Sequence, residues 1–272
     1  MPKLLHTPPA TNSAPREQSG TDRLEFKAGI FFFAQESLRE LKTVTNRSLS
    51  VSDPGRWVST NDILTALLWC AVIKAETSES DAHGFTTIGF PVNFRSRLDP
   101  PLCSDFLGSA FMMTTAKALL DDLLSSSIED EGAGDGTLPA DATARLARIA
   151  LTIHNAVNAV DGAQVRAVLE YLRAQTDVQS VVLGPPHDGI SIVSWADQGA
   201  YELDWGAAVG RCEAVRLPRP ARRRYPIILP RIPDSLDGRA GLEVFVSLEQ
   251  TAFGRFVRSW PISRWAEPRC GS

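Results

Sequence analysis

Apolar residues recur along this chain with two periods, one typical of strands and one typical of helices. Residues 24–33 have a strand-like pattern, and leucines spaced along residues 35–42 predict a short helix. A longer helix is predicted after Ser59, where hydroxyl and carboxylate groups stand at capping-box spacing before apolar residues at helical intervals. Further helices are predicted over 140–160, 162–175 and 250–258, and strands over 86–92, 178–183, 190–195, 213–217, 225–229 and 242–248.

Strands interleaved with helices, several close enough for antiparallel pairing, predict an α/β layered sandwich with a mixed sheet. Two segments do not fit this pattern. Residues 1–22 hold four prolines among polar residues and predict a disordered tail, while residues 125–139, rich in serine, glycine and acidic side chains, predict a flexible surface loop. We therefore expect one folded domain over residues 23–272.

Composition narrows the class of protein. The 272 residues are 43% apolar, enough for a large core, and the net charge of −4 argues against a nucleic-acid-binding chain. The four cysteines are too few and too widely spread for a disulfide framework or a zinc site. The chain has no signal peptide and no apolar run of membrane-spanning length. These observations predict a soluble, cytoplasmic protein.

Familiar catalytic motifs are absent from the sequence. It has no P-loop, no GxSxG elbow and no HExxH, and the glycines of residues 132–136 read as a loop because no strand precedes them. The histidines His6, His83, His154 and His187 stand far apart, and His154 has no acidic residue four positions later. We expect each to be a surface or turn residue, and we predict no metal site.

Three segments, in order and suitably spaced, carry a resemblance. Residues 58–69 begin the capped helix, residues 92–109 contain Asn93-Phe94-Arg95 and later Gly108, and Asp204-Trp205-Gly206 precedes Arg216. Together they resemble the C-terminal half of the BAHD acyltransferases, especially the fungal branch that includes trichothecene O-acetyltransferase-like proteins. The resemblance implies one half of a two-domain, chloramphenicol acetyltransferase-like fold.

The resemblance also implies a chemistry. Such enzymes transfer an acyl group from acyl-CoA, a co-substrate rather than a permanently bound cofactor, to a hydroxyl or amine, here of a secondary metabolite. Their general base is the histidine of an HxxxD motif in the first domain, and no HxxxD occurs in this sequence. We therefore expect an inactive or incomplete acyltransferase. The alternative is a truncated, non-catalytic domain that acts as a binding or interaction module.

Site residues follow from the same resemblance. Asp204 of the Asp204-Trp205-Gly206 motif is expected to pair with Arg95 as a structural ion pair, the alternative being an aspartate in solvent. Ser59 and Thr60 either approach the pantetheine arm of CoA or simply cap a helix. The arginines of residues 219–224, namely Arg219, Arg222, Arg223 and Arg224, either meet the phosphates of CoA or lie in a solvated loop.

A missing sister domain would leave apolar surface uncovered. The candidates are residues 30–33, with three consecutive phenylalanines, and residues 111–113, with Phe111, Met112 and Met113. They predict self-association or binding of an N-terminal domain. The alternative is that residues 31–33 belong to a central strand that is buried on both faces.

Overall fold

The computed structural model describes residues 25–77, 84–124, 139–178, 189–217, 224–234 and 238–271. The predicted tail, nearly all of the predicted loop at 125–139 and most of the predicted strand at 178–183 lie outside these ranges. The helices are α1 (Gln35–Ser52), α2 (Thr60–Glu76), α3 (Leu120–Leu124), α4 (Ala140–Asn158), α5 (Gly162–Arg173), α7 (Gln250–Arg258) and α8 (Trp260–Trp265), with a 3-10 turn at η2 (Arg95–Arg97). The strands are β1 (Phe26–Ala34), β2 (Phe85–Asn93), β3 (Phe111–Leu119), β4 (Ile190–Ser191), β5 (Val193–Ser194), β6 (Ile227–Ile228), β7 (Gly241–Glu249) and β8 (Glu267–Gly271).

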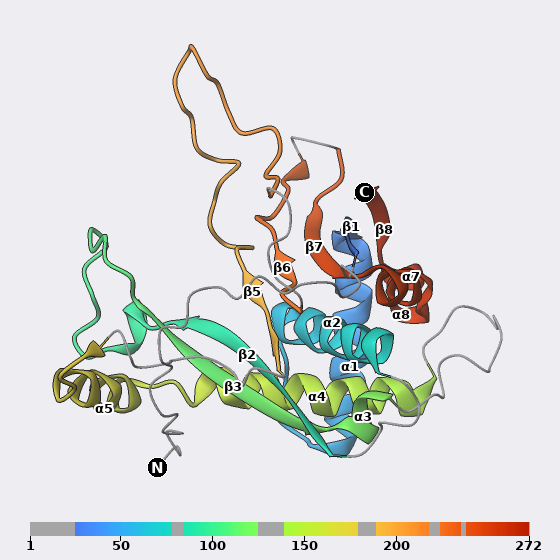
Figure 1. Cartoon of the computed structure of the whole chain (residues 1–272), viewed down its shortest axis with the longest axis horizontal. Coiled ribbons are helices and arrows are strands. Elements are labelled where there is room, and N and C mark those ends of the chain that lie inside the picture. The colour runs from blue at the N-terminus through green and yellow to red at the C-terminus, as the bar shows by residue number, and fades with distance from the viewer. Residues whose placement is uncertain are drawn as a thin grey trace, which may run out of the picture.

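The strands form two sheets, both mixed (Figure 1). The larger sheet has the order β5-β6-β7-β1-β8, in which β5 and β6 run parallel and the other neighbours antiparallel. The smaller sheet has the order β3-β2-β4, with β3 antiparallel and β4 parallel to β2. The chain passes from one sheet to the other at Ile192, between β4 and β5. The predicted α/β class with mixed sheets is confirmed.

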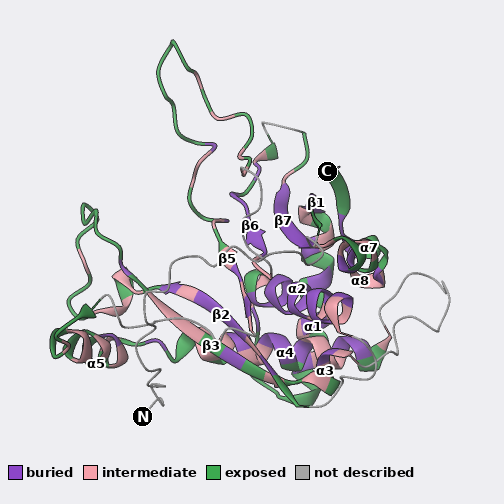
Figure 2. Ribbon diagram, in the orientation of Figure 1, coloured by how far each residue is buried: buried purple, intermediate pink, exposed green. Residues whose placement is uncertain are grey.

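Helix α2 is the centre of the core. It packs against α1, α3, α4, α7 and α8, and Figure 2 shows it buried along most of its length. Its sequence is apolar on every face, as a helix enclosed by other elements must be. The capping box predicted at its start is present, with Ser59 as the N-cap. No described helix is both long and apolar enough to cross a membrane.

The phenylalanine-rich strand β1 is buried rather than exposed. It lies between β7 and β8, and the side chains of residues 30–33 are all at most 5% exposed. Phe31 packs against the rings of Phe253 and Phe256 on α7. The prediction that residues 30–33 form uncovered surface is therefore wrong, and the alternative of a central strand buried on both faces is confirmed.

Several elements differ from their predicted extents. Helix α1 runs ten residues further than predicted, because Leu38, Leu41, Thr45 and Leu49 continue one buried face and the first breaker is Pro54. The predicted strand at 190–195 is divided between two sheets, and residues 213–217 form no strand. Strand β3 was not predicted. Its residues adopt a strand because they pair with β2 over nine positions.

Candidate functional site

Residues 201–216 form a segment that projects from the body of the domain and is drawn in orange in Figure 1. The Asp204-Trp205-Gly206 motif forms a tight turn in this projecting segment. The Asp204 carboxylate accepts a hydrogen bond from the Gly206 N–H at 2.8 Å, and the Trp205 N–H donates to the Gly210 carbonyl at 2.8 Å. Gly206 and Gly210 both adopt positive φ angles, 83° and 78°, which favour glycine. The turn leaves the indole of Trp205 61% exposed.

The base of this projecting segment is anchored to the larger sheet by Arg216. Its guanidinium makes two hydrogen bonds to Glu243 on β7, at 2.7 and 3.3 Å, and the Glu243 side chain is 1% exposed. The Tyr201 hydroxyl accepts a hydrogen bond from the Val215 N–H at 3.3 Å. Burial raises the pKa of Tyr201 above its ordinary value, so this hydroxyl stays neutral at physiological pH. These contacts fix both ends of the segment.

The structure does not bring Arg95 and Asp204 together. Arg95 follows β2 and donates to the Gly108 carbonyl at 2.7 Å, while Asp204 lies in the projecting turn (Figure 1). The ion pair expected between them is absent from the described part of the chain. Because Asp204 is exposed and accepts a hydrogen bond from its own turn, its charge is stabilised by solvent and backbone without an arginine.

Ser59 and Thr60 lie at the start of α2. The Ser59 hydroxyl accepts from the Asp62 N–H at 3.2 Å, and the Ser59 N–H donates to the Asp62 carboxylate at 2.8 Å. The helix N-cap accounts for Ser59 without a ligand, and contact of Ser59 or Thr60 with a pantetheine arm stays a prediction.

Asp62 also binds a histidine that is distant in sequence. His154 Nδ1 lies 2.9 Å from the Asp62 carboxylate, and His154 Nε2 lies 2.8 Å from the Asn158 side-chain amide. The Trp57 ring completes the environment of His154, with the two ring centroids 4.9 Å apart and the ring planes inclined at 63°. The expectation that His154 is a surface residue is wrong, since its side chain is 15% exposed. No local pattern could have revealed a partner 92 residues away.

The Asp62–His154 pair predicts a stability effect. Replacing His154 with alanine leaves the buried carboxylate of Asp62 without one of its partners, and we expect a loss of about 1–2 kcal/mol in the free energy of unfolding. Chemical denaturation followed by circular dichroism measures this loss. Asn158→Ala is the matched control on the same helix, because it leaves the Asp62 contact intact. Equal losses in the two variants would contradict the structural importance of the pair.

Of the four arginines predicted to bind phosphate, only Arg224 lies among the described residues. Arg224 forms an ion pair with Glu76, whose side chain is 1% exposed near the end of α2. Arg224 thus compensates a buried carboxylate, which is a structural role. Arg219, Arg222 and Arg223 lie outside the described residues, as do His6, His83 and His187, so their expected roles stay predictions. Within the described ranges, no three His, Cys, Asp or Glu side chains are grouped to hold a metal ion.

Comparison with known proteins places these features in context. The model of the Transferase family matches residues 4–132. The O-acetyltransferase ptmV of Penicillium ochrochloron is 30% identical over 238 residues, which cover 80% of this chain and 46% of that protein. The O-acetyltransferase anaAT of Neosartorya fischeri is 27% identical over 221 residues, covering 74% and 42% respectively. The chain spans about half the length of the curated relatives it matches.

Solved structures share the fold. TRI101 of F. sporotrichioides, complexed with coenzyme A and T-2, superimposes with a TM-score of 0.69 at 23% identity, over 98% of this chain and 56% of that one. TRI101 of F. graminearum, complexed with coenzyme A and deoxynivalenol, gives 0.71 at 20% identity, over 92% and 51%. The two mixed sheets and their helices therefore match a part of each of these larger proteins.

Proposed function

Because this chain belongs to the BAHD acyltransferase family, we propose that it is the C-terminal half of an enzyme that transfers an acyl group from acyl-CoA to a hydroxyl or amine of a secondary metabolite. The observation that carries the proposal is its 30% identity to a fungal O-acetyltransferase over 80% of the chain, although it spans 46% of that protein. The coenzyme A bound by the structural neighbours supports acyl-CoA as the co-substrate.

The proposed reaction needs a base that this sequence does not supply in the family's motif. The acceptor oxygen or nitrogen attacks the thioester carbonyl, the C–S bond breaks, and the proton of the acceptor passes through a base to the CoA thiolate. His154 does not match that role, because Nδ1 contacts Asp62 and Nε2 contacts Asn158. We infer that a domain carrying HxxxD provides the base, and that this chain alone is inactive.

Exposed apolar side chains support a partner domain. The projecting turn presents Leu203, Trp205 and Val209, which are at least 50% exposed, and Phe111 is 54% exposed at the start of β3. Burial of such side chains against a second domain is favourable, since it removes apolar area from water. Of the two surfaces predicted from the sequence, this support covers Phe111 alone, because Met112 and Met113 are half-buried and Met112 packs against the core.

A thiol-release assay with acetyl-CoA and a panel of alcohols and amines tests the proposal. We expect no turnover by the chain alone. With a domain that carries the HxxxD histidine, supplied as a separate polypeptide or by fusion, we expect turnover about 10²–10⁴-fold above that of the same complex without the histidine. The matched control is the same domain with that histidine replaced by alanine.

Two outcomes would overturn the proposal. Turnover by the chain alone that disappears in His154→Ala or His187→Ala would show that this chain carries its own base. A complemented protein that is folded and binds CoA but gives no turnover with any acceptor would favour the alternative of a non-catalytic binding module. Sequencing the transcript upstream of Met1 complements the assay, since an in-frame HxxxD there identifies the domain to supply.

A further inference from the structure

Strand β3 has one edge that no described strand covers. In the smaller sheet, whose order is β3-β2-β4, β2 pairs with one side of β3 over its whole length, and no described strand lies on the other side. The other outer strands are protected: β4 and β5 have two residues each, and β8 contains Pro268 between Glu267 and Arg269. Strand β3 has nine residues, no proline and a single charged residue, Lys117. Its open edge is therefore the one most suited to pairing among the described strands.

The hydrogen bonds to β2 determine which groups of β3 point to the open side. The Phe94 N–H donates to the Ala110 carbonyl at 3.0 Å, just beyond one end of the paired residues. The Leu120 N–H donates to the Gly84 carbonyl at 3.0 Å, just beyond the other end. Because hydrogen-bonded and non-hydrogen-bonded pairs alternate in an antiparallel ladder, the even-numbered residues of β3 bond to β2. The odd-numbered residues therefore direct their N–H and C=O groups outward: Phe111, Met113, Thr115, Lys117 and Leu119.

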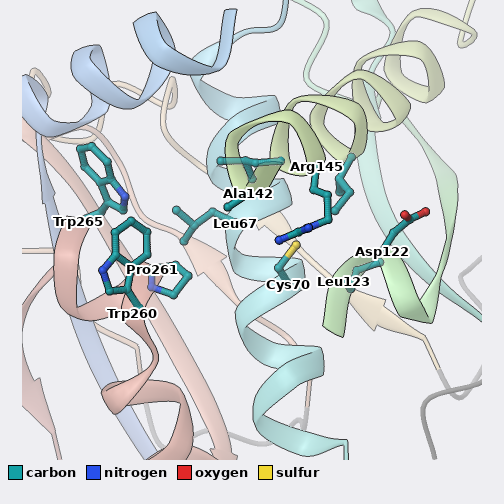
Figure 3. A pocket seen from close by; sticks show the side chains of 11 residues that line it. Leu67, Cys70, Asp122, Leu123, Ala142, Arg145, Trp260, Pro261 and Trp265 are labelled. Atoms are coloured by element: carbon teal, nitrogen blue, oxygen red, sulfur yellow. The ribbon is translucent and has the colours of Figure 1, made fainter. Parts of the chain in front are cut away.

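The open edge is fixed by the elements around it. The inner face of β3 is buried, since Ala116 is 3% exposed and Met112 packs against the core. Beyond its last residue the chain enters α3, where Leu123 is 5% exposed and lies with Leu67 and Ala142 around a small cavity (Figure 3). The outward N–H and C=O groups themselves have no hydrogen-bond partner among the described residues. A strand that binds here meets a formed template, so little ordering of this chain opposes binding.

Charge and space around the edge select the occupant. Lys117 is exposed, and its Nζ lies 4.0 Å from the centroid of the Phe85 ring, so an acidic residue on a neighbouring strand is favoured opposite it. A second copy of β3 does not fit, because α4 packs against β3. Two paired copies of β3 would lie about 4.8 Å apart, whereas the axes of packed helices need about 8–10 Å. The space suits a single extended strand.

We propose that the open edge of β3 binds an extended segment of a partner protein as an additional antiparallel strand. The segment has no proline where it faces β3, an acidic residue opposite Lys117, and apolar residues opposite Phe111 and Leu119, which are both exposed. Backbone hydrogen bonds supply the affinity and alternate side chains supply the specificity, as in other cases of strand addition. Binding is independent of acyl transfer.

A synthetic peptide tests the proposal. The probe has nine residues of alternating valine and threonine, begins with valine, and has glutamate at its third position, opposite Lys117 when its first residue lies opposite Leu119. Fluorescence anisotropy of the labelled peptide measures its Kd for the full chain. The control peptide is N-methylated at positions 3, 5 and 7, which keeps the side chains but removes three donors that face β3. We expect it to bind about tenfold more weakly, or less.

Hydrogen exchange followed by NMR locates the bound peptide. Without peptide, the outward amides of Thr115 and Lys117 should exchange faster than those of Thr114 and Ala116, which bond to β2. With the peptide at ten times its Kd, exchange at Thr115 and Lys117 should slow about 11-fold, because these amides then exchange only in the unbound fraction. If they are already as slow as Thr114 and Ala116 without peptide, the edge is covered and the proposal is overturned.

Two variants at Thr115 complete the test. Thr115→Pro removes one outward N–H without removing a bond to β2, and edge strands accept proline at such positions. It should weaken binding by about 2- to 12-fold, while Thr115→Val, which keeps the N–H, should change it by less than about 2-fold. The proposal is overturned if the two variants bind equally, if the N-methylated peptide binds as tightly as the probe, or if the probe does not bind at millimolar concentration. It is also overturned if the chain is a dimer that Thr115→Pro dissociates, since a second copy is then the occupant.

Discussion

Replacing Arg216 with alanine is expected to lower the free energy of unfolding by about 3 kcal/mol. The variant leaves the Glu243 carboxylate, which is 1% exposed on β7, without the two hydrogen bonds that compensate its burial. We expect the lower end of the range for broken buried pairs, because the Arg216 side chain is itself 45% exposed. Urea denaturation followed by circular dichroism measures the loss.

Arg231 provides a closely matched control. Its side chain is also 45% exposed, but its partner Asp197 is 92% exposed and lies 3.6 Å away. Such surface pairs contribute at most about 1 kcal/mol, so Arg231→Ala should cost little. Adding Glu243→Gln to Arg216→Ala should recover part of the loss, since it removes the uncompensated charge. Similar losses for Arg216→Ala and Arg231→Ala would show that Arg216 does not anchor the projecting segment.

Replacing Trp69 with alanine is expected to cost about 3–5 kcal/mol, because it creates a cavity in the centre of the core. Trp69 lies on α2 with no exposed surface, and it is among the largest fully buried side chains. Trp69→Phe should cost less than about 1.5 kcal/mol, since phenylalanine keeps most of the volume. It also removes the indole N–H, which has no acceptor among the described residues.

The same denaturation experiment separates burial from residue type. Trp205→Ala, at a position that is 61% exposed, should change the free energy of unfolding by less than about 0.5 kcal/mol in the isolated chain. If Trp69→Phe were as damaging as Trp69→Ala, the hydrogen-bonding group rather than the volume of Trp69 would be the important feature. If Trp205→Ala were costly, the projecting turn would contribute to the core.

Local sequence was sufficient to predict the start of helix α2 and the strand β1. The serine and carboxylate of the capping box, three residues apart, together with the apolar run that follows, predicted the start of α2. The three consecutive phenylalanines of β1, residues 31–33, allowed a strand buried on both faces, and that alternative is confirmed. Strand β3 gave no such signal, because its strand conformation depends on pairing with β2.

The ion pairs, in contrast, could not be predicted from local sequence. The sequence, through its resemblance, suggested an Asp204–Arg95 pair, whereas the structure has buried carboxylates paired at Arg216–Glu243 and Arg224–Glu76. Which charges meet depends on where distant segments pack, since a carboxylate requires a partner only where burial removes water. Asp204 is exposed and has no such requirement.

By itself, the sequence determined the α/β class, the capped central helix and the likeness to an acyltransferase half without its HxxxD histidine. These features depend on periodicity, on residues a few positions apart and on short ordered motifs. The tertiary structure alone decided the Asp62–His154 contact and the Arg216–Glu243 anchor. The members of these pairs lie 92 and 27 residues apart, and only chain packing brings such residues within hydrogen-bonding distance.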